Sequence, residues 1–264
     1  MSTSDSTPDR GGNPVTRHAS WVGRFVFKYR DYLAPAVGIL ILAYVRPRPL
    51  FGSERADRWL DLVGVLVALT GQSIRATVIG LAYIVRGGAK KQLAAPRLVR
   101  EGFYAHSRNP MYLGNFLLLL GLALIYNAPL VYLVGLPACV GGLFSIVLAE
   151  EEFLRGQFGA EYDDYCHAVN RFLPDVRGLR QTLSRMRFDW RRVLRKEYGT
   201  TFAWTSTAIV FLAYERVLWH GLAQSAPALR TLGVVWLALG VCYFVVRWLK
   251  KSGRLASPDY QPAA

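Results

Sequence analysis

Six apolar runs alternate with polar, mostly basic segments along the chain. They cover residues 33–45, 59–85, 116–125, 130–149, 202–219 and 232–249. A helix that crosses a bilayer needs roughly 20 apolar residues, with about 17 as the lower limit. The first run holds only 13 residues, so it spans by borrowing flanking residues such as Tyr29 and Leu50, or it is re-entrant. The pattern predicts an all-α integral membrane protein with about six transmembrane helices.

The third and fourth runs are joined by a short turn, residues 126–129, and should form an antiparallel helical hairpin. A polar box, residues 102–114, precedes the first of these helices, and Glu150-Glu151-Glu152 follows the second. Because the hairpin is antiparallel, the box and the glutamates should meet at one end of it.

These boxes resemble a family pattern, that of the integral-membrane methyltransferases that include isoprenylcysteine carboxyl methyltransferases and phospholipid N-methyltransferases. The ordered set covers about 75 residues. In chain order it reads Gly102-Phe103-Tyr104, Arg108-Asn109-Pro110-Met111-Tyr112-Leu113-Gly114, Glu150-Glu151, Phe158-Gly159-Ala160-Glu161-Tyr162-Asp163-Asp164-Tyr165 and Arg171-Phe172-Leu173-Pro174.

The resemblance implies S-adenosylmethionine as cofactor, bound in a cytoplasmic-face pocket built around the hairpin. Glu150 and Glu151 would bind the cofactor or orient the nucleophile, and Arg171 would close the pocket. Two glycines, Gly102 and Gly114, would allow close backbone approach. The cofactor wall would consist of Tyr104, Arg108, Asn109, Pro110 and Tyr112.

The methyl acceptor stays open between a phospholipid amine and the carboxylate of a prenylated cysteine. Many members of the resembled family have His where Asn109 stands. This departure removes a possible imidazole base, so no histidine is expected to act as general base. The Asn109 version leans toward the lipid amine, whereas the Phe158-Gly159 box occurs on both sides of the family.

Arg75 lies in the middle of the second apolar run, beside Gln72 and Ser73. An arginine at that depth costs several kcal/mol on insertion scales, so it should face a cavity or a partner. Two interpretations follow with equal weight. Arg75 is either a catalytic residue, or a structural one that snorkels from a helix that begins late or pairs with a glutamate.

Composition supports the membrane interpretation. The chain is 52% hydrophobic, with a mean hydropathy of +0.20 and a net charge of +14. Long apolar runs separate the basic clusters, which argues against nucleic-acid binding and favours basic loops beside anionic lipid. The three cysteines are far apart, without a Cys-x-x-Cys pair, so neither a disulfide framework nor a metal site is predicted.

The expected division of the chain follows the runs. It comprises a disordered leader (1–20), N-terminal transmembrane helices (21–96), the methyltransferase core (97–174), a basic cytoplasmic connector (175–200), a transmembrane hairpin (201–250) and a tail (251–264). Placing the basic segments 86–111 and 150–200 in the cytoplasm follows the positive-inside tendency. Segment 46–58, with four arginines, breaks it.

Two other functions fit parts of the sequence. Sterol reductases that use NADPH share the same helical core, but should carry more N-terminal spans. A non-catalytic scaffold would present the basic segment 177–196 to anionic lipid. The sequence does not determine the oligomeric state.

Overall fold

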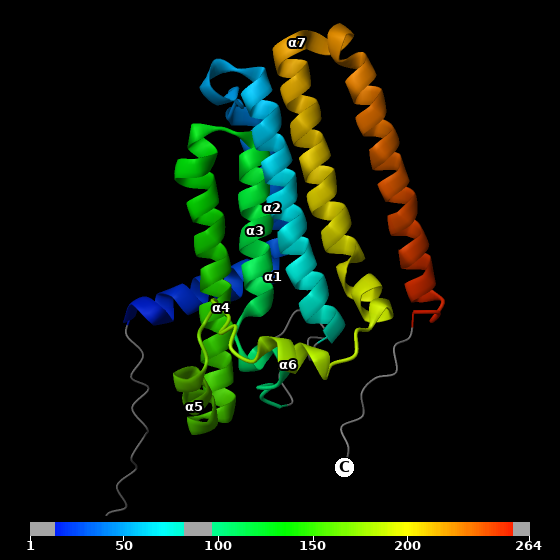
Figure 1. The fold of residues 1–264 in the computed structure, drawn as a ribbon. Helices are drawn as coiled ribbons and strands as arrows, with labels where there is room; N and C mark the ends of the chain where they lie inside the picture. Colours follow the sequence, from blue (N-terminus) through cyan, green and yellow to red (C-terminus); the bar gives the residue numbers. More distant parts are fainter. Residues whose placement is uncertain (1–13, 82–96, 256–264) are drawn as a thin grey trace, which may run out of the picture.

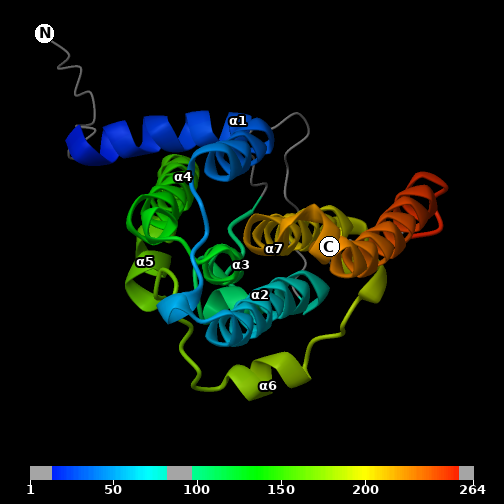
Figure 2. The ribbon, with the colours of Figure 1, turned by 90° about the horizontal axis from the view of Figure 1, so that it is seen from above.

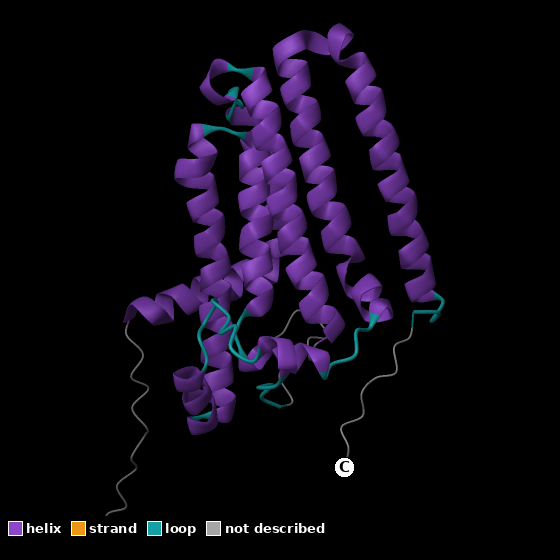
Figure 3. Ribbon diagram, viewed as in Figure 1, coloured by secondary structure: helices purple, strands orange, loops and turns teal. Residues whose placement is uncertain are grey.

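The computed structural model describes residues 14–81 and 97–255, and every regular element in these ranges is helical (Figure 3). This confirms the all-α class. The α-helices are α1 (Pro14–Tyr44), α2 (Glu54–Leu81), α3 (Pro110–Tyr126), α4 (Leu136–Phe158), α5 (Ala160–Ala168), α6 (Leu179–Ser184) and α7 (Trp190–Lys251). Two 3-10 turns, η1 (Leu50–Gly52) and η2 (Gly102–Ala105), and a π-helical turn, η3 (Val131–Gly135), complete the set.

Three helical segments are long and apolar enough to cross a membrane: Glu54–Leu81, Val131–Phe158 and Trp190–Lys251. The apolar helix α3 is shorter, at 17 residues. The membrane character is therefore confirmed in its coarse form, and the count of six spans stays a prediction.

The predicted hairpin is present as α3, a tight turn, and η3 running into α4. Asn127 ends α3 in a left-handed conformation (φ 40°), which reverses the chain. Its N–H caps the helix by donating to Ala123 O at 3.0 Å. Asn tolerates this conformation better than most residues. Figure 1 shows the two helices running in opposite directions.

The most extensive helix contact joins α2 to α3, and glycines make it possible. A Cβ on Gly64 would lie 2.8 Å from Gly121 O, and a Cβ on Gly114 would lie 2.7 Å from Gly71 O. Small residues let helix backbones approach closely in membranes, where van der Waals packing drives association. Seen from above, α2 and α3 lie side by side with the first arm of α7 next to them (Figure 2).

Helix α7 is two antiparallel arms. At Gly221 the backbone turns (φ 73°, ψ 170°), and the second arm descends beside the first (Figure 1). Ring contacts join the arms, with Phe202 and Tyr243 centroids 4.8 Å apart. The two predicted apolar runs are these arms, but the residues after Gly221 that were expected to form a connector are helical.

Helix α1 begins at Pro14, so residues 14–20 of the expected disordered leader are helical instead. Residues 1–13 lie outside the described ranges. The later part of α1 runs antiparallel to α4: Gly23 meets Ser145 and Ala149, whereas Gly135 lies near Ile41. The first apolar run is thus the C-terminal half of a 31-residue helix.

Candidate functional site

A buried carboxylate, Glu151, lies at the end of the hairpin, surrounded by motif side chains. Its exposed fraction is 4%. Arg171 donates to both carboxylate oxygens, from Nε at 3.1 Å and from Nη2 at 2.9 Å. Nη1 of Arg108 lies 3.4 Å from the same carboxylate, and Nδ2 of Asn109 donates to it at 3.3 Å. The prediction that the Arg-Asn-Pro-Met-Tyr box meets the glutamates is confirmed.

Two chain segments form the walls of this cluster. Residues 106–109 are hydrogen-bonded to residues 170–175, so that Asn109 N–H donates to Arg171 O at 3.0 Å. Helix α3 starts immediately afterwards with Pro110, at a position where the missing N–H costs no hydrogen bond. The Arg108 and Arg171 side chains therefore both contact Glu151, although they belong to segments about 60 residues apart in the sequence.

His106 anchors the same wall and does not join the cluster. It is buried, with Nδ1 2.7 Å from Asp175 O and Nε2 2.9 Å from the Thr182 hydroxyl. One ring nitrogen thus contacts α6 and the other contacts the segment that leads into it. The expectation that no histidine serves as general base stays a prediction.

Helix α5 closes the cluster from a third side. Gly159 (φ 53°) turns the chain out of α4, and the buried rings of Tyr162 and Tyr165 follow. Burial raises the pKa of both phenols, and for Tyr162 the carboxylate of Glu151 acts in the same direction. Both phenols therefore stay protonated. Tyr165 donates to Tyr104 O at 2.6 Å, a structural bond.

The cluster contains an unused donor. Nε of Arg108 is buried and, among the described residues, has no hydrogen-bond partner. Its Nη1 donates to the Cys166 sulfur at 2.7 Å. A buried N–H without a partner is costly in a native structure. Together with the Glu151 carboxylate, it gives a site that can bind a zwitterionic group.

The other predicted cofactor residues lie around this cluster. Tyr112 is buried against Ile146 and Val147 on α4, and Tyr104 packs in a second apolar cluster with Met111. Gly102 has φ +64°, a conformation that favours glycine. The cofactor roles of these residues stay predictions.

The three glutamates at the end of α4 differ in environment. Glu152 is exposed and pairs with Arg24 at 3.0 Å. Glu150 is half-buried and makes other contacts. Glu151 is buried and accepts the contacts from Arg108, Asn109 and Arg171 described above.

Arg75 lies in a separate polar cluster between α2 and the first arm of α7. It donates to both oxygens of Glu197, from Nε at 2.9 Å and from Nη2 at 2.7 Å, and both residues are buried. Gln72 also donates to Glu197, at 3.0 Å, and Arg75 donates to Asn115 on α3. Of the two interpretations, this geometry favours the structural pair.

Gly114 belongs with this second cluster. A Cβ there would lie 2.6 Å from Cγ of Arg75. The close approach that Gly114 allows in this structure is with α2, and its expected role at the cofactor stays a prediction.

Sequence reasoning missed Glu197 as a partner and Cys166 as an acceptor. The signal for Glu197 was available, because a buried arginine in an apolar helix needs a carboxylate and Glu197 stands shortly before the apolar run 202–219.

Comparison with known proteins supports the family inferred from the motifs. Residues 62–161 match the family model described as phospholipid methyltransferase. A protein-S-isoprenylcysteine O-methyltransferase of Xenopus laevis is 30% identical over 128 residues, which cover 46% of this chain and 43% of that protein. The protein of the same name from Saccharomyces cerevisiae is 28% identical over 132 residues, or 48% of this chain and 54% of the yeast protein.

The chain thus spans about half the length of the curated relatives it matches. No solved structure matches it. The matched residues include the box and the glutamates, but α7 lies outside the family-model match.

Proposed function

Because residues 62–161 carry the pattern of the phospholipid methyltransferase family, we propose that this chain is a membrane-embedded methyltransferase that uses S-adenosylmethionine. The methyl acceptor is a lipid amine or the carboxylate of a prenylated cysteine. The observation that carries the proposal is the Glu151 cluster, in which motif residues from three segments converge on one buried carboxylate.

The residues of the cluster fit the cofactor's chemistry. Bound S-adenosylmethionine supplies a methyl group activated by a sulfonium, and its amino acid end carries one ammonium and one carboxylate. Glu151 would pair with the ammonium. The unpartnered Nε–H of Arg108 would donate to the carboxylate, and Arg171 is partly exposed and can reorient to do the same.

The protein contributes by binding and orienting the cofactor and the methyl acceptor, and His106 takes no part as a general base. Methyl transfer forms a bond between the acceptor and the methyl carbon as the bond to sulfur breaks. It gains most from holding the two reactants in line and away from water. The raised pKa of Tyr162 keeps its phenol neutral. No phenolate therefore forms beside the negatively charged carboxylate of Glu151.

The place of the cluster suits an acceptor that arrives from the bilayer. It lies where α3 begins and α4 leaves the apolar bundle (Figure 1). Basic residues are dense in the segment that follows, 175–200, which favours a cytoplasmic position for this end. A water-soluble cofactor and a membrane-bound acceptor can both reach such a place.

Methyl transfer in lipid nanodiscs tests the proposal. Methyl-labelled S-adenosylmethionine is supplied with phosphatidylethanolamine in one arm and a farnesylated cysteine in the other. Label in either extracted product supports the proposal and identifies the acceptor. If folded, monodisperse protein labels neither and does not bind S-adenosylhomocysteine, the proposal is wrong, and NADPH binding then tests the reductase alternative.

A further inference from the structure

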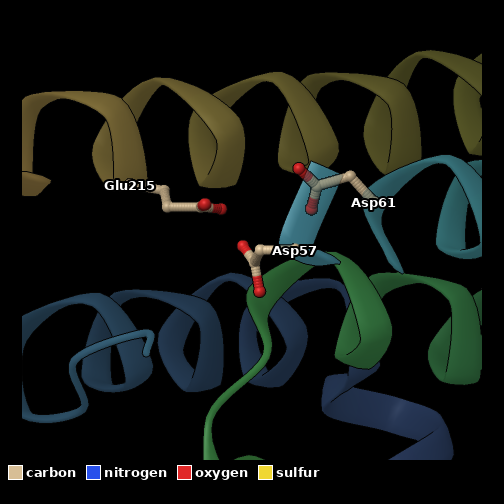
Figure 4. Close-up of side chains that lie close together, drawn as sticks. All are labelled: Asp57, Asp61 and Glu215. Atoms are coloured by element: carbon tan, nitrogen blue, oxygen red, sulfur yellow. The ribbon is translucent and has the colours of Figure 1, made fainter. Parts of the chain in front are cut away.

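A third polar site, distinct from the Glu151 and Arg75–Glu197 clusters, lies at the opposite end of the bundle from Glu151. Asp57 and Asp61, one turn apart on α2, face Glu215 on the first arm of α7. One carboxylate oxygen from each lies within 4.8 Å of the other two. Figure 4 shows the three carboxyl groups gathered in the space between the two helices.

Asp57 and Glu215 are buried, Asp61 is half-buried, and all three are incompletely hydrogen-bonded among the described residues. Asp57 is 1% exposed and Glu215 is 5% exposed. Three oxygens, Oδ2 of Asp57, Oδ1 of Asp61 and Oε2 of Glu215, are buried without a hydrogen-bond partner among the described residues. Buried carboxylates close together repel each other and lose their hydration, so they need positive charge.

The orientation of Asp57 is fixed by the surrounding chain. Its Oδ1 accepts from Leu50 N at 2.9 Å and from Asn127 Nδ2 at 2.6 Å. Both donors come from elements other than α2, so one oxygen of Asp57 is saturated by protein. Its other oxygen is left for the space shared with Asp61 and Glu215.

The nearby cations supply only part of the charge required. Arg216 acts electrostatically on both Asp61 and Glu215. It leaves the three oxygens without a donor among the described residues. Arg58 and Arg216 both line an adjoining cavity of about 310 Å³ together with Asp61 and Glu215, so two guanidinium groups lie near three carboxylates.

We propose that Asp57, Asp61 and Glu215 bind a hard divalent cation of the Ca²⁺ or Mg²⁺ type. Carboxylate oxygens are the preferred ligands of these ions, and at Ca²⁺–O distances of roughly 2.3–2.6 Å two opposite ligands lie about 4.6–5.2 Å apart. The observed separation of at most 4.8 Å matches that size. The cavity provides an entry path and room for water ligands.

The cation would join α7 to the α2–α3 pair. Arg75 and Glu197 already join α2 to α7 at the other end, and at 1.5 Å per residue Asp61 and Arg75 are roughly 21 Å apart along α2. Two polar contacts, one ionic and one mediated by the cation, would then fix the register of α7. This role is structural and independent of methyl transfer.

Thermal unfolding of chelator-treated protein tests the proposal, with Ca²⁺, Mg²⁺ and Mn²⁺ added separately. We expect a saturable rise in Tm of roughly 5–10 °C at about one hundred times Kd. Asp61→Asn and Glu215→Gln should abolish at least nine tenths of that rise. Asp164→Asn, which removes an exposed acid on α5, is the matched control and should keep it.

A second measurement covers variants that fail to fold. Electron paramagnetic resonance of Mn²⁺ with the wild-type protein should report one bound ion per chain, displaced by Ca²⁺. The proposal is overturned if no cation raises Tm, or if the variants respond as the wild type does. If, in addition to the cations having no effect, the amide variants raise Tm, the three carboxyl groups share protons and bind no cation.

Discussion

Arg75 and Glu197 form a buried ion pair whose role at the residue scale can be decided by substitution. Arg75 donates two hydrogen bonds to the carboxylate of Glu197. Both side chains are about nine-tenths buried or more. A buried pair of this kind contributes little over a well-packed apolar pair, but removing one partner leaves an uncompensated charge. The sequence allowed both a catalytic and a structural role for Arg75.

We therefore predict strong non-additivity between the two positions. Arg75→Met alone and Glu197→Met alone should each destabilise the protein by about 3–5 kcal/mol, and the double variant should recover most of that loss. Thermal or denaturant unfolding in detergent gives the four free energies of the cycle. The double variant should also keep methyl transfer, and a stable but inactive double variant would instead make Arg75 a catalytic residue.

The site residues themselves were accessible to sequence reasoning only in part. The boxes around Arg108 and Glu151 are local patterns, and a short turn fixes how they meet. Which of three successive glutamates is buried depends on the rotation of α4 against Arg171, which no local pattern specifies. The acidic site was missed because Asp57 and Glu215 are more than 150 residues apart and come together only through the packing of α7.

At the element scale, the contact between α2 and α3 depends on pairs of glycines. Gly64 and Gly71 on α2 face Gly121 and Gly114 on α3, and the two glycines of each helix are seven positions apart. That spacing is visible in the sequence and marks a helix–helix face, whereas the apolar run of α3 shows no polar side. The helical span of α2 also starts earlier than predicted, because Glu54 and Asp57 favour a helix N-terminus.

Adding a methyl group to this contact should separate the helices. A Cβ on Gly121 would lie 2.5 Å from Gly64 O and 2.7 Å from Ala68 N. We expect Gly121→Ala to destabilise the protein by about 1–3 kcal/mol. Gly240→Ala, where a Cβ meets nothing within 4 Å, should be neutral or stabilising by up to about 1 kcal/mol. Equal Tm values for the two variants would contradict this packing.

At the scale of the whole molecule, the two ends of the bundle carry their charges differently. The Glu151 end leads into the arginine-rich segment 175–200, whereas the opposite end combines the carboxylates of Asp57, Asp61 and Glu215 with the four arginines of segment 46–58. The sequence predicted most helices of the bundle from apolar runs. It could not predict the long first helix or the helical connector after Gly221, because both depend on contacts with distant segments.

Cysteine labelling should place the two ends on opposite sides of the membrane. The three native cysteines are free and can be replaced by serine. Ser184→Cys, near the Glu151 end, and Ser53→Cys, at the other end, are both exposed positions. In sealed inside-out vesicles an impermeant maleimide should label Ser184→Cys and spare Ser53→Cys until detergent is added. The reverse pattern would contradict the cytoplasmic site.

Calorimetric binding of S-adenosylhomocysteine to purified protein tests most directly whether the Glu151 cluster binds the methyl donor. Wild type and Glu152→Gln, which removes an exposed carboxylate that pairs with Arg24, should bind with the same affinity. Glu151→Gln should bind at least tenfold more weakly, a loss of about 1.4 kcal/mol or more. Unchanged binding in a folded Glu151→Gln variant, or no binding to the wild type, would contradict the claim.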